Sequence, residues 1–455
     1  MRYEPITRQL FIENRSRLAG LLPSNALAVL NANDTCPTNA DGNQNTVVNS
    51  DLFYLTGVEQ EQTLLLIYPD ADEEKHRELL FLREPTAENE LWEGRKLSKS
   101  EARKLTGIEN IHWLSEFPAL FHRLICECDH VFLNSNEHKR AVVEVESREA
   151  RFAAATMRKY PLHNYRRLAQ LLHRLRAIKS EAEIHLIRKA CALTDQGFRR
   201  VLSFTRPGVF EYQVEAEFAH EFTSHGGRMA YQPIIAGGLN ACSLHYLANE
   251  QICRDGELLL LDVGASYANY NSDMTRTIPI NGKFSRRQRQ VYNAVLNVLR
   301  QAITGLVPGK KIKDWQKEVE QMTERELVNL GLLSARQIKG QDPDQPAFKK
   351  YLMHGVGHPL GLDVHDVGIT TKPIEAGWVM TVEPGIYLPE EGFAVRLENN
   401  VLITDRGPVD LMADIPIEAD EIEALMISRK WSRNGRNGHR VTSVTPQRQM
   451  SAKQR

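Results

Sequence analysis

The stretch ELLLLDVGASYANYNSDMTRTIPI (residues 257–280) decides the fold of the second half of the chain. Its four consecutive leucines end on Asp262, and Asp273 opens the second apolar segment. Two such segments joined by a polar connection predict a β-hairpin that brings both carboxylates together. Because a carboxylate at the end of a buried strand is costly to desolvate, the pair needs a compensating positive charge, unless both aspartates merely cap loops.

Two further acids occupy the same kind of position. Glu383 lies near the end of WVMTVEP (378–384), and Glu398 lies within AVRLENNVLIT (394–404), both of which we expect to be strands. Four carboxylates at strand positions repel one another at close range unless cations lie between them. The acids therefore predict a metal site.

The segment YLMHGVGHPLGLDVHD (351–366) places His354, His358 and His365 among glycines that allow tight turns. A single such histidine is usually a core residue, but three in one glycine-rich loop indicate a functional site. One imidazole with four carboxylates forms an oxygen-rich ligand set, which suits Mn²⁺ best and also accepts Fe²⁺, Co²⁺ or Zn²⁺. Two divalent ions balance the four negative charges, whereas one does not, so we predict a dinuclear centre.

Three regions are expected along the chain: residues 1–170, 171–427 and 428–455. In the first, apolar segments alternate with helical patterns, which predicts an α/β domain. The strands expected there are ALAVL, FYLT (53–56), TLLLIY (63–68) and LLFL (79–82). Residues 166–206 are expected to be nearly continuous helix, in which a capping box of Ser180 and Glu183 marks a new start at the domain boundary.

The second region combines helices, expected at about 210–225, 285–304 and 312–331, with the strands named above, which indicates an α+β domain. The third region (428–455) has eight Lys or Arg and no acid, and is predicted to be disordered. Contact of this segment with nucleic acid or an acidic surface is the alternative.

Composition excludes several classes of protein. The 455 residues carry a net charge of −1, so no nucleic-acid or anionic membrane partner is expected for the body of the chain. The first residues lack the apolar core of a signal peptide, and no apolar run approaches the length of a membrane span. The six scattered cysteines are expected to be reduced thiols of a cytoplasmic protein.

The order Asp, Asp, His, Glu, Glu with these neighbours resembles the pita-bread metallopeptidases. HGVGHPLGLDVHD and TVEPGIY are similar to the aminopeptidase P branch, as are NSDLFYLTGVEQEQTLLLI (49–67) and ENELWEGRKL (88–97). The resemblance covers roughly residues 3–427. It implies an α/β N-terminal domain followed by an α+β pita-bread catalytic domain that binds two divalent metal ions, with Mn²⁺ preferred.

The resemblance also implies roles for individual residues. The implied metal ligands are Asp262, Asp273, His358, Glu383 and Glu398, of which Asp273 and Glu398 would bridge the ions. The implied catalytic residues are Glu383 as proton shuttle, His245 near the substrate's amino end, and His365 at the scissile carbonyl. The implied substrate-binding residues are His354, Tyr387 and Arg396 around the proline ring, and Trp92, which would reach a neighbouring subunit's active site. Asn399 and Asn400 depart from the family, whose members often carry acids there.

The function implied is release of the N-terminal residue from Xaa-Pro-Yaa peptides by a hydroxide that bridges the two metals, in a homo-oligomer (dimer or tetramer). The nearest alternative is prolidase, which shares the metal site but cuts only Xaa-Pro dipeptides. Methionine aminopeptidase fits less well because it lacks the large N-terminal domain. A non-enzymatic pita-bread module that binds histones or other proteins is disfavoured, because such modules lose metal ligands and this chain retains all five.

Overall fold

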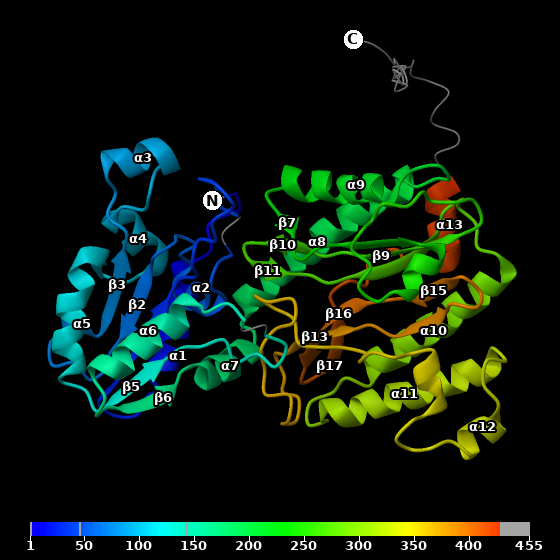
Figure 1. Ribbon diagram of the computed structural model, residues 1–455. Helices are drawn as coiled ribbons and strands as arrows, with labels where there is room; N and C mark the ends of the chain where they lie inside the picture. Colours follow the sequence, from blue (N-terminus) through cyan, green and yellow to red (C-terminus); the bar gives the residue numbers. More distant parts are fainter. Residues whose placement is uncertain (1, 45–46, 142–143, 428–455) are drawn as a thin grey trace, which may run out of the picture.

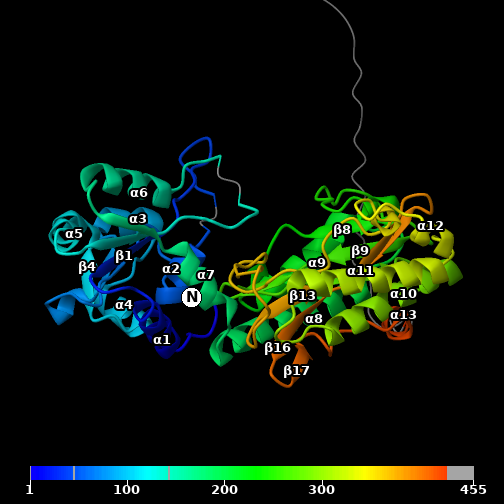
Figure 2. The same cartoon turned by 90° about the horizontal axis from the view of Figure 1, so that it is seen from below.

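A computed structural model describes residues 2–44, 47–141 and 144–427, so the predicted basic tail (428–455) lies outside the described residues. The chain forms two lobes that lie side by side, with the N-terminal lobe in blue and cyan and the larger second lobe in green to red (Figure 1). The view from below separates the same two lobes (Figure 2). In the part of the chain described, no helix is long and apolar enough to cross a membrane.

The N-terminal lobe is a mixed six-stranded sheet, in the order β4-β3-β2-β1-β5-β6, with helices on both faces. Its strands are β1 (Ala26–Asn31), β2 (Leu64–Ile67), β3 (Glu78–Leu82), β4 (Asn110–Trp113), β5 (His130–Leu133) and β6 (Asn164–Arg167). Its helices are α1 (Arg8–Ala19), α2 (Ser50–Thr56), α3 (Ala87–Glu93), α4 (Lys99–Thr106), α5 (Phe117–Ile125) and α6 (Arg148–Lys159).

The central strand β1 is buried on both faces, which is why its sequence is apolar up to its last residue, Asn31, which bonds to Glu149. Leu27 and Val29 pack with α5 through Phe117 and Phe121, whereas Ala28 and Leu30 face the side that α1 and α2 cover. The predicted strands ALAVL, TLLLIY and LLFL are confirmed as β1, β2 and β3.

The prediction of a strand at FYLT was wrong, because these residues belong to helix α2. Asn49 caps the helix by accepting a hydrogen bond from the Leu52 amide, and Gly57 ends it with φ 69°. A Cβ on Gly57 would lie 2.4 Å from the Phe11 ring, so this position requires glycine. A short apolar run fits both a strand and a fully buried helix. Here the capping residues on either side of the run favour the helix.

Helix α7 (Ala169–Ala177) follows β6 and packs against α1 of the N-terminal lobe. The second lobe has helices α8 (Glu181–Phe204), α9 (Glu211–Ser224), α10 (Arg286–Thr304), α11 (Ile312–Asn329), α12 (Ala335–Lys339) and α13 (Ala419–Ile427). Its strands are β7 (Arg228–Met229), β8 (Ile234–Gly237), β9 (Leu258–Asp262), β10 (Ala265–Tyr267), β11 (Tyr270–Asn271), β12 (Thr275–Pro279), β13 (Val379–Val382), β14 (Gly385–Leu388), β15 (Phe393–Arg396), β16 (Asn399–Thr404) and β17 (Gly407–Asp410). The helices predicted near 210–225, 285–304 and 312–331 are confirmed as α9, α10 and α11.

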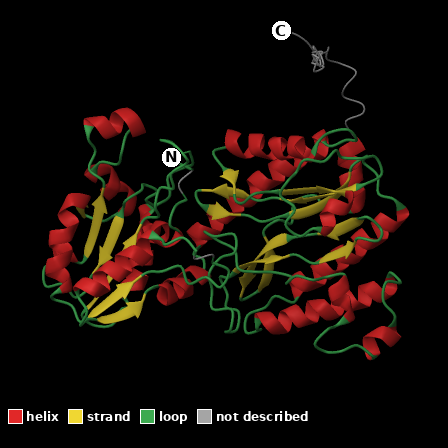
Figure 3. Ribbon diagram, in the orientation of Figure 1, coloured by secondary structure: helices red, strands yellow, loops and turns green. Residues whose placement is uncertain are grey.

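The strands of the second lobe form four small antiparallel sheets, in the orders β11-β10-β7, β12-β9-β8, β13-β16-β17 and β14-β15. They lie between helices α8 and α9 on one side and α10 and α11 on the other (Figure 3). The predicted hairpin is confirmed, because β9 and β12 pair with Asp262 opposite Thr275. The short strands β10 and β11 are inserted between them in the sequence and join another sheet.

Three predicted elements need correction. The expected helix over 166–206 is broken, because Ile178 is extended and Ser180 caps a new helix, with the predicted capping box to Glu183 present. The segment 394–404 forms two strands rather than one: β15 pairs with β14, and β16 pairs with β13. Glu398 therefore lies where the chain passes from one sheet to the other. Asp273 precedes β12 instead of opening it.

Candidate metal centre

Five ligand-type side chains converge from the ends of strands in the second lobe. Asp262 is the last residue of β9, and the other acids follow or precede strands in the connections β11–β12, β13–β14 and β15–β16. His358 lies in the loop before β13. A carboxylate at the end of a strand does not interrupt the sheet, and the ends of these small sheets lie close together. The residues so placed are Asp262, Asp273, His358, Glu383 and Glu398.

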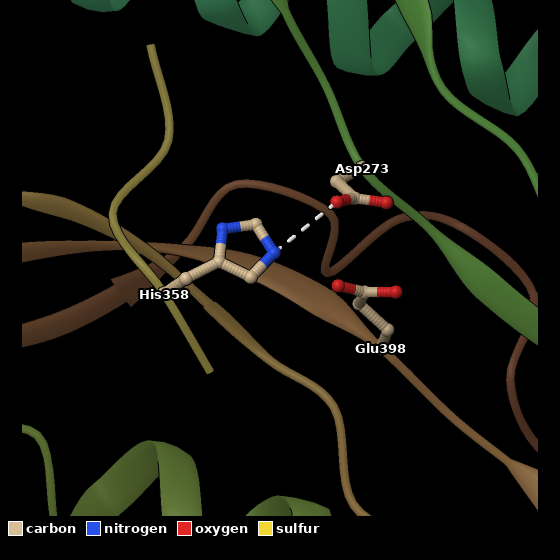
Figure 4. A group of neighbouring side chains, drawn as sticks. All are labelled: Asp273, His358 and Glu398. Carbon is tan, nitrogen blue, oxygen red and sulfur yellow. Dashed lines mark ion pairs between the residues drawn. The ribbon is translucent and has the colours of Figure 1, made fainter. Parts of the chain in front are cut away.

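Asp273, His358 and Glu398 form the tightest group, with one ligand atom from each residue lying within 4.8 Å of the others. All three are buried, and the His358 ring points toward the two carboxylates (Figure 4). His358 Nε2 lies 3.5 Å from Asp273 Oδ2 and 3.7 Å from Glu383 Oε1. This separation leaves room for a cation between the imidazole and the carboxylates.

The His358 ring is oriented by its own backbone. Its Nδ1 lies 3.0 Å from the Pro359 carbonyl oxygen, so Nδ1 carries the hydrogen and Nε2 presents a lone pair to the cluster. Burial lowers the pKa of His358, which keeps the ring neutral as a metal ligand requires. The His358 amide also donates to the Thr381 hydroxyl of β13 at 3.0 Å.

Without cations the acids strongly oppose one another's ionisation. Burial and the charge of Asp262 raise the pKa of Asp273 well above its ordinary value. Burial and Asp273 raise the pKa of Glu398 in the same way, and burial and Glu398 raise that of Glu383. Full ionisation of this cluster therefore needs bound positive charge.

Tyr231 is part of the cluster, although its sequence context carries no signal for it. Its hydroxyl lies 2.6 Å from Asp262 Oδ1 and 2.5 Å from Asp273 Oδ1. Burial and these two acids raise the pKa of Tyr231 well above its ordinary value, so the phenol stays protonated. One hydroxyl proton shared between two carboxylates holds them side by side and partly offsets their repulsion.

A chain of hydrogen bonds leads from the acids to His354. Arg396 donates from Nη2 to Asp262 Oδ2 at 2.6 Å and from Nη1 to the Tyr387 hydroxyl at 2.7 Å. The Tyr387 hydroxyl lies 2.7 Å from His354 Nε2, and His354 Nδ1 lies 2.8 Å from the Gly355 carbonyl oxygen. Since Nδ1 donates to that carbonyl, Nε2 accepts from Tyr387. The three residues expected around a proline ring are thus one connected group.

His365 and His245 lie near the same cluster. The His365 ring packs edge-on against His358 with centroids 4.3 Å apart. Although His365 is partly exposed, the desolvation of its ring, with a contribution from His358, lowers its pKa to about 3. The exposed His245 is close enough to His354 and His365 that its charge contributes to their lowered pKa values, in both cases after burial.

Trp92 is far from this cluster in its own chain. Its side chain is 80% exposed on α3, a helix without buried residues at the outer edge of the N-terminal lobe (Figure 1). Within one chain, the structure therefore does not bring Trp92 together with the other predicted site residues.

Two asparagines that follow Glu398 support the centre through backbone contacts. The Asn400 side chain donates from Nδ2 to the Asp273 carbonyl oxygen at 2.6 Å. Its Oδ1 accepts from the backbone amide of Asp273 at 3.0 Å. Asn399 accepts from the buried guanidinium of Arg276, which also donates to the Glu398 carbonyl oxygen at 2.7 Å. Thr275 donates to Glu398 Oε2 at 2.7 Å. The asparagines thus fix the ligands' backbone without adding negative charge.

The N-terminal lobe contributes to the opening beside the metal centre. A cavity of about 270 Å³ is lined by His358 and His365 from the second lobe and by residues 137–140 from the first. Its N-terminal lining includes the acid Glu137 and the bases Lys139 and Arg140.

The donor set fits divalent cations. Both oxygens of Asp262 already accept hydrogen bonds, but each carboxylate oxygen has a second lone pair for a metal. Four carboxylates and one neutral imidazole are hard ligands of the kind that bind Mn²⁺, Co²⁺ or Zn²⁺. The arrangement is therefore that of a metal-dependent hydrolase rather than of a thiolate site.

Comparison with known families agrees with this geometry. Residues 185–405 match the model of metallopeptidase family M24, and residues 11–132 match that of the aminopeptidase P N-terminal domain. The fold and the site define a metallopeptidase, with an α/β N-terminal domain and an α+β pita-bread catalytic domain as predicted.

Individual relatives extend the match over nearly the whole chain. The Xaa-Pro aminopeptidase of Escherichia coli K12 is 34% identical over 93% of this chain and 99% of its own, and human Xaa-Pro aminopeptidase 3 is 32% identical over 83% and 76%. The structure is similar to zinc-substituted E. coli aminopeptidase P in complex with product, with a TM-score of 0.83, 33% identity, and coverage of 93% and 99%. The chain belongs to the aminopeptidase P group of the M24 metallopeptidases.

Proposed function

We propose that this metallopeptidase releases the N-terminal residue from peptides with proline at the second position. The observation that carries the proposal is the hydrogen-bonded chain from Asp262 through Arg396 and Tyr387 to His354, which couples the metal cluster to the ring pair of Tyr387 and His354. Relatives named Xaa-Pro aminopeptidase support the same substrate class. Peptides with a penultimate proline are thus the proposed partners, with no nucleic acid and no membrane involved.

We assign the metal ligands to Asp262, Asp273, His358, Glu383 and Glu398, which would hold two divalent ions, with Asp273 and Glu398 as the ligands that both ions would share. When bound, two divalent ions would supply a hydroxide nucleophile at neutral pH and polarise the scissile carbonyl. Mn²⁺ is the proposed metal because the ligand set is dominated by carboxylates.

The protein's own groups then move protons and hold the substrate. Glu383 takes up the proton of the attacking water and delivers it to the proline nitrogen as that bond breaks. His365, neutral at pH 7, keeps one ring N–H with which to donate to the developing oxyanion. His245 lies toward the substrate's amino end, and His354, Tyr387 and Arg396 enclose the proline ring.

The experiment that tests this function compares three substrates on apo-protein reconstituted with Mn²⁺, Co²⁺ or Zn²⁺. An Xaa-Pro-Yaa tripeptide is expected to be cleaved after its first residue, while an Xaa-Pro dipeptide and an Xaa-Ala-Yaa tripeptide are cleaved far more slowly. Cleavage of the dipeptide alone would establish prolidase activity instead. No hydrolysis with any metal would reject the enzymatic function.

We further propose a cytoplasmic homo-oligomer, a dimer or tetramer, whose neighbouring subunit receives Trp92. Support comes from the exposure of Leu91 and Trp92 on α3, which is unusual for two adjacent large apolar side chains. The six cysteines, all free, agree with a reducing compartment. Light scattering of the wild type and of Trp92→Ala tests the assembly, and a monomeric wild-type protein would reject it. We also propose the domain division 1–170, 171–427 and 428–455.

A further inference from the structure

A cluster of charges around the buried Arg176 joins the two lobes beside the loop that carries His365. Arg176, at the end of α7, is 3% exposed and donates from Nη1 to Asp51 Oδ1 at 2.7 Å. Asp51 belongs to α2 of the N-terminal lobe. Helices α2 and α7 lie on the side of that lobe that faces the catalytic domain (Figures 1 and 2).

The same guanidinium holds the loop that carries His365. Its Nη2 donates to Asp366 Oδ1 at 2.6 Å and to Asp363 Oδ2 at 2.7 Å. Lys179 Nζ donates to the other oxygen of Asp366 at 2.9 Å, and the Lys179 and Asp366 side chains are each 1% exposed. Both oxygens of Asp366 are therefore bound by cations that water does not screen.

The close contact of Asp366 and Lys179 with the backbone requires glycine at position 361. A Cβ on Gly361 would lie 2.2 Å from Asp366 Oδ2 and 2.9 Å from Lys179 Cε, so only glycine admits this arrangement. Ser50, beside Asp51 in α2, donates to Asp363 Oδ1 at 2.7 Å. The start of α2 thus contacts both the guanidinium and the loop.

The two histidines of this region are held by different side-chain contacts, although the Asp366 amide also donates to the Pro359 carbonyl oxygen at 2.9 Å. His358 is fixed on β13, because its amide and carbonyl both bond to Thr381 and the Leu360 amide donates to the Val379 carbonyl oxygen at 3.0 Å. His365 is adjacent in sequence to Asp366, whose side chain is held by Arg176 and Lys179. A change at Arg176 should therefore disturb His365 before it disturbs the metal ligand.

We propose that Arg176 is a positioning residue that anchors Asp366 to Asp51 of the N-terminal lobe and thereby holds His365 at the scissile carbonyl. The proposal rests on the function proposed above for His365. It assigns the N-terminal lobe a part in catalysis within its own chain, separate from the role proposed for Trp92.

The test uses Arg176→Lys and Asp51→Asn in the full-length metal-loaded enzyme. The Arg176→Lys side chain keeps the positive charge, but it lacks the planar guanidinium with which Arg176 binds Asp51 and Asp366 at once. We expect kcat to fall about 10- to 100-fold with metal content unchanged and KM altered less than about 3-fold, the loss typical of a misplaced catalytic group. Arg15→Lys is the matched control, because Arg15 is equally buried and bonded to Glu78 and the Leu55 carbonyl oxygen, away from the loop.

A double-mutant cycle with His365→Ala separates positioning from general destabilisation. If Arg176 acts through His365, Arg176→Lys lowers kcat in the wild type but not in the His365→Ala background. Additive losses, or an equal loss of kcat in Arg15→Lys, would overturn the proposal.

Hydrogen exchange measured by mass spectrometry gives a readout independent of activity. We expect Arg176→Lys to speed exchange in peptides covering residues 361–368, and Arg15→Lys to speed exchange only in N-terminal-lobe peptides. Unchanged exchange over 361–368 would overturn the positioning role even if the enzyme is active. A wild type without Xaa-Pro-Yaa hydrolysis would instead reject the proposed function, while the exchange result would still decide whether Arg176 anchors the loop.

Discussion

Arg396 donates a hydrogen bond to Asp262 at 2.6 Å, and this pair of a buried guanidinium and a partly buried carboxylate connects the metal ligands to the residues proposed to enclose proline. Although burial opposes its charge, Tyr387 and Asp262 raise the pKa of Arg396 well above its ordinary value. The guanidinium therefore stays charged at any pH at which the protein is folded. The planar guanidinium of Arg396 is needed, because one cation must bind Asp262 and Tyr387 at the same time.

Replacing this guanidinium should uncouple the residues proposed to enclose proline from the metal site. For Arg396→Lys we expect kcat/KM on Xaa-Pro-Yaa to fall about 10- to 100-fold, since the lysine keeps the charge but cannot reach Asp262 and Tyr387 at once. Steady-state kinetics checks this, with Arg406→Lys on the exposed β16–β17 turn as the control. Wild-type kcat/KM in Arg396→Lys would show that the pair has no part in catalysis.

Glu383 is the proposed proton shuttle as well as a ligand. Glu383→Gln keeps the volume but removes the base, so kcat should fall about 10²- to 10⁴-fold. Glu390→Gln, an exposed change that removes only a surface pair with Lys350, should retain wild-type rates. Normal turnover by Glu383→Gln on Xaa-Pro-Yaa would refute the assignment.

Tyr231 should tune metal binding. Tyr231→Phe removes the hydroxyl that lies between Asp262 and Asp273, and we expect metal affinity to drop about 10- to 100-fold, as is typical when a ligand's orienting partner is lost. Calorimetric titration of apo-protein with Mn²⁺ measures the affinity. Tyr267→Phe serves as control because this tyrosine lies near the N-terminus, where its hydroxyl accepts from the Glu4 amide. Equal affinities for wild type and Tyr231→Phe would exclude the role.

The stability of metal-free protein should fall as pH rises. The pKa values of Asp273, Glu383 and Glu398 are raised in the folded state, so the folded protein binds more protons than the unfolded chain above the ordinary carboxyl range. The contribution of these groups is full at low pH and is lost as pH rises through their folded-state pKa values. Urea unfolding with EDTA between about pH 5 and 8 should follow this trend, less steeply in Glu383→Gln.

Added Mn²⁺ should reverse the trend, because metal binding requires the deprotonated ligands. Stabilisation by the metal is therefore expected to grow with pH over the same interval. An EDTA-treated wild type with the same pH slope as Glu383→Gln would contradict the assigned direction of the Glu383 shift.

Replacing Asn400 tests how the contact of its side chain with Asp273 supports the metal-free site. An aspartate there could not donate to the Asp273 carbonyl oxygen and would add a charge beside the ligands. For Asn400→Asp we expect the free energy of unfolding of metal-free protein to fall by about 1–3 kcal/mol, the cost of a buried group left without its partner. Asn43→Asp, at an exposed position, is the control and should change stability little. An apo-protein unaffected by Asn400→Asp would show that the site tolerates an acid at this position.

The sequence alone was informative about local patterns. Strand periodicity and the capping box of Ser180 and Glu183 predicted β9, β12 and the start of α8 correctly. Acids at strand ends singled out the residues that converge in the structure, because a carboxylate beside an apolar run is unusual whatever the tertiary fold. FYLT was predicted wrongly, since its helix depends on the caps at Asn49 and Gly57 more than on its apolar residues.

Only the tertiary structure revealed the partners that complete the site. Tyr231 joins Asp262 across 31 residues, and Arg176 meets Asp366 across 190. The passage of Glu398 between two sheets likewise depends on which strands pair. The sequence by itself therefore determined which side chains have the chemistry to bind metal, because that is a property of residue type and local pattern. The fold decided which groups orient them, because those contacts join segments that are far apart in the chain.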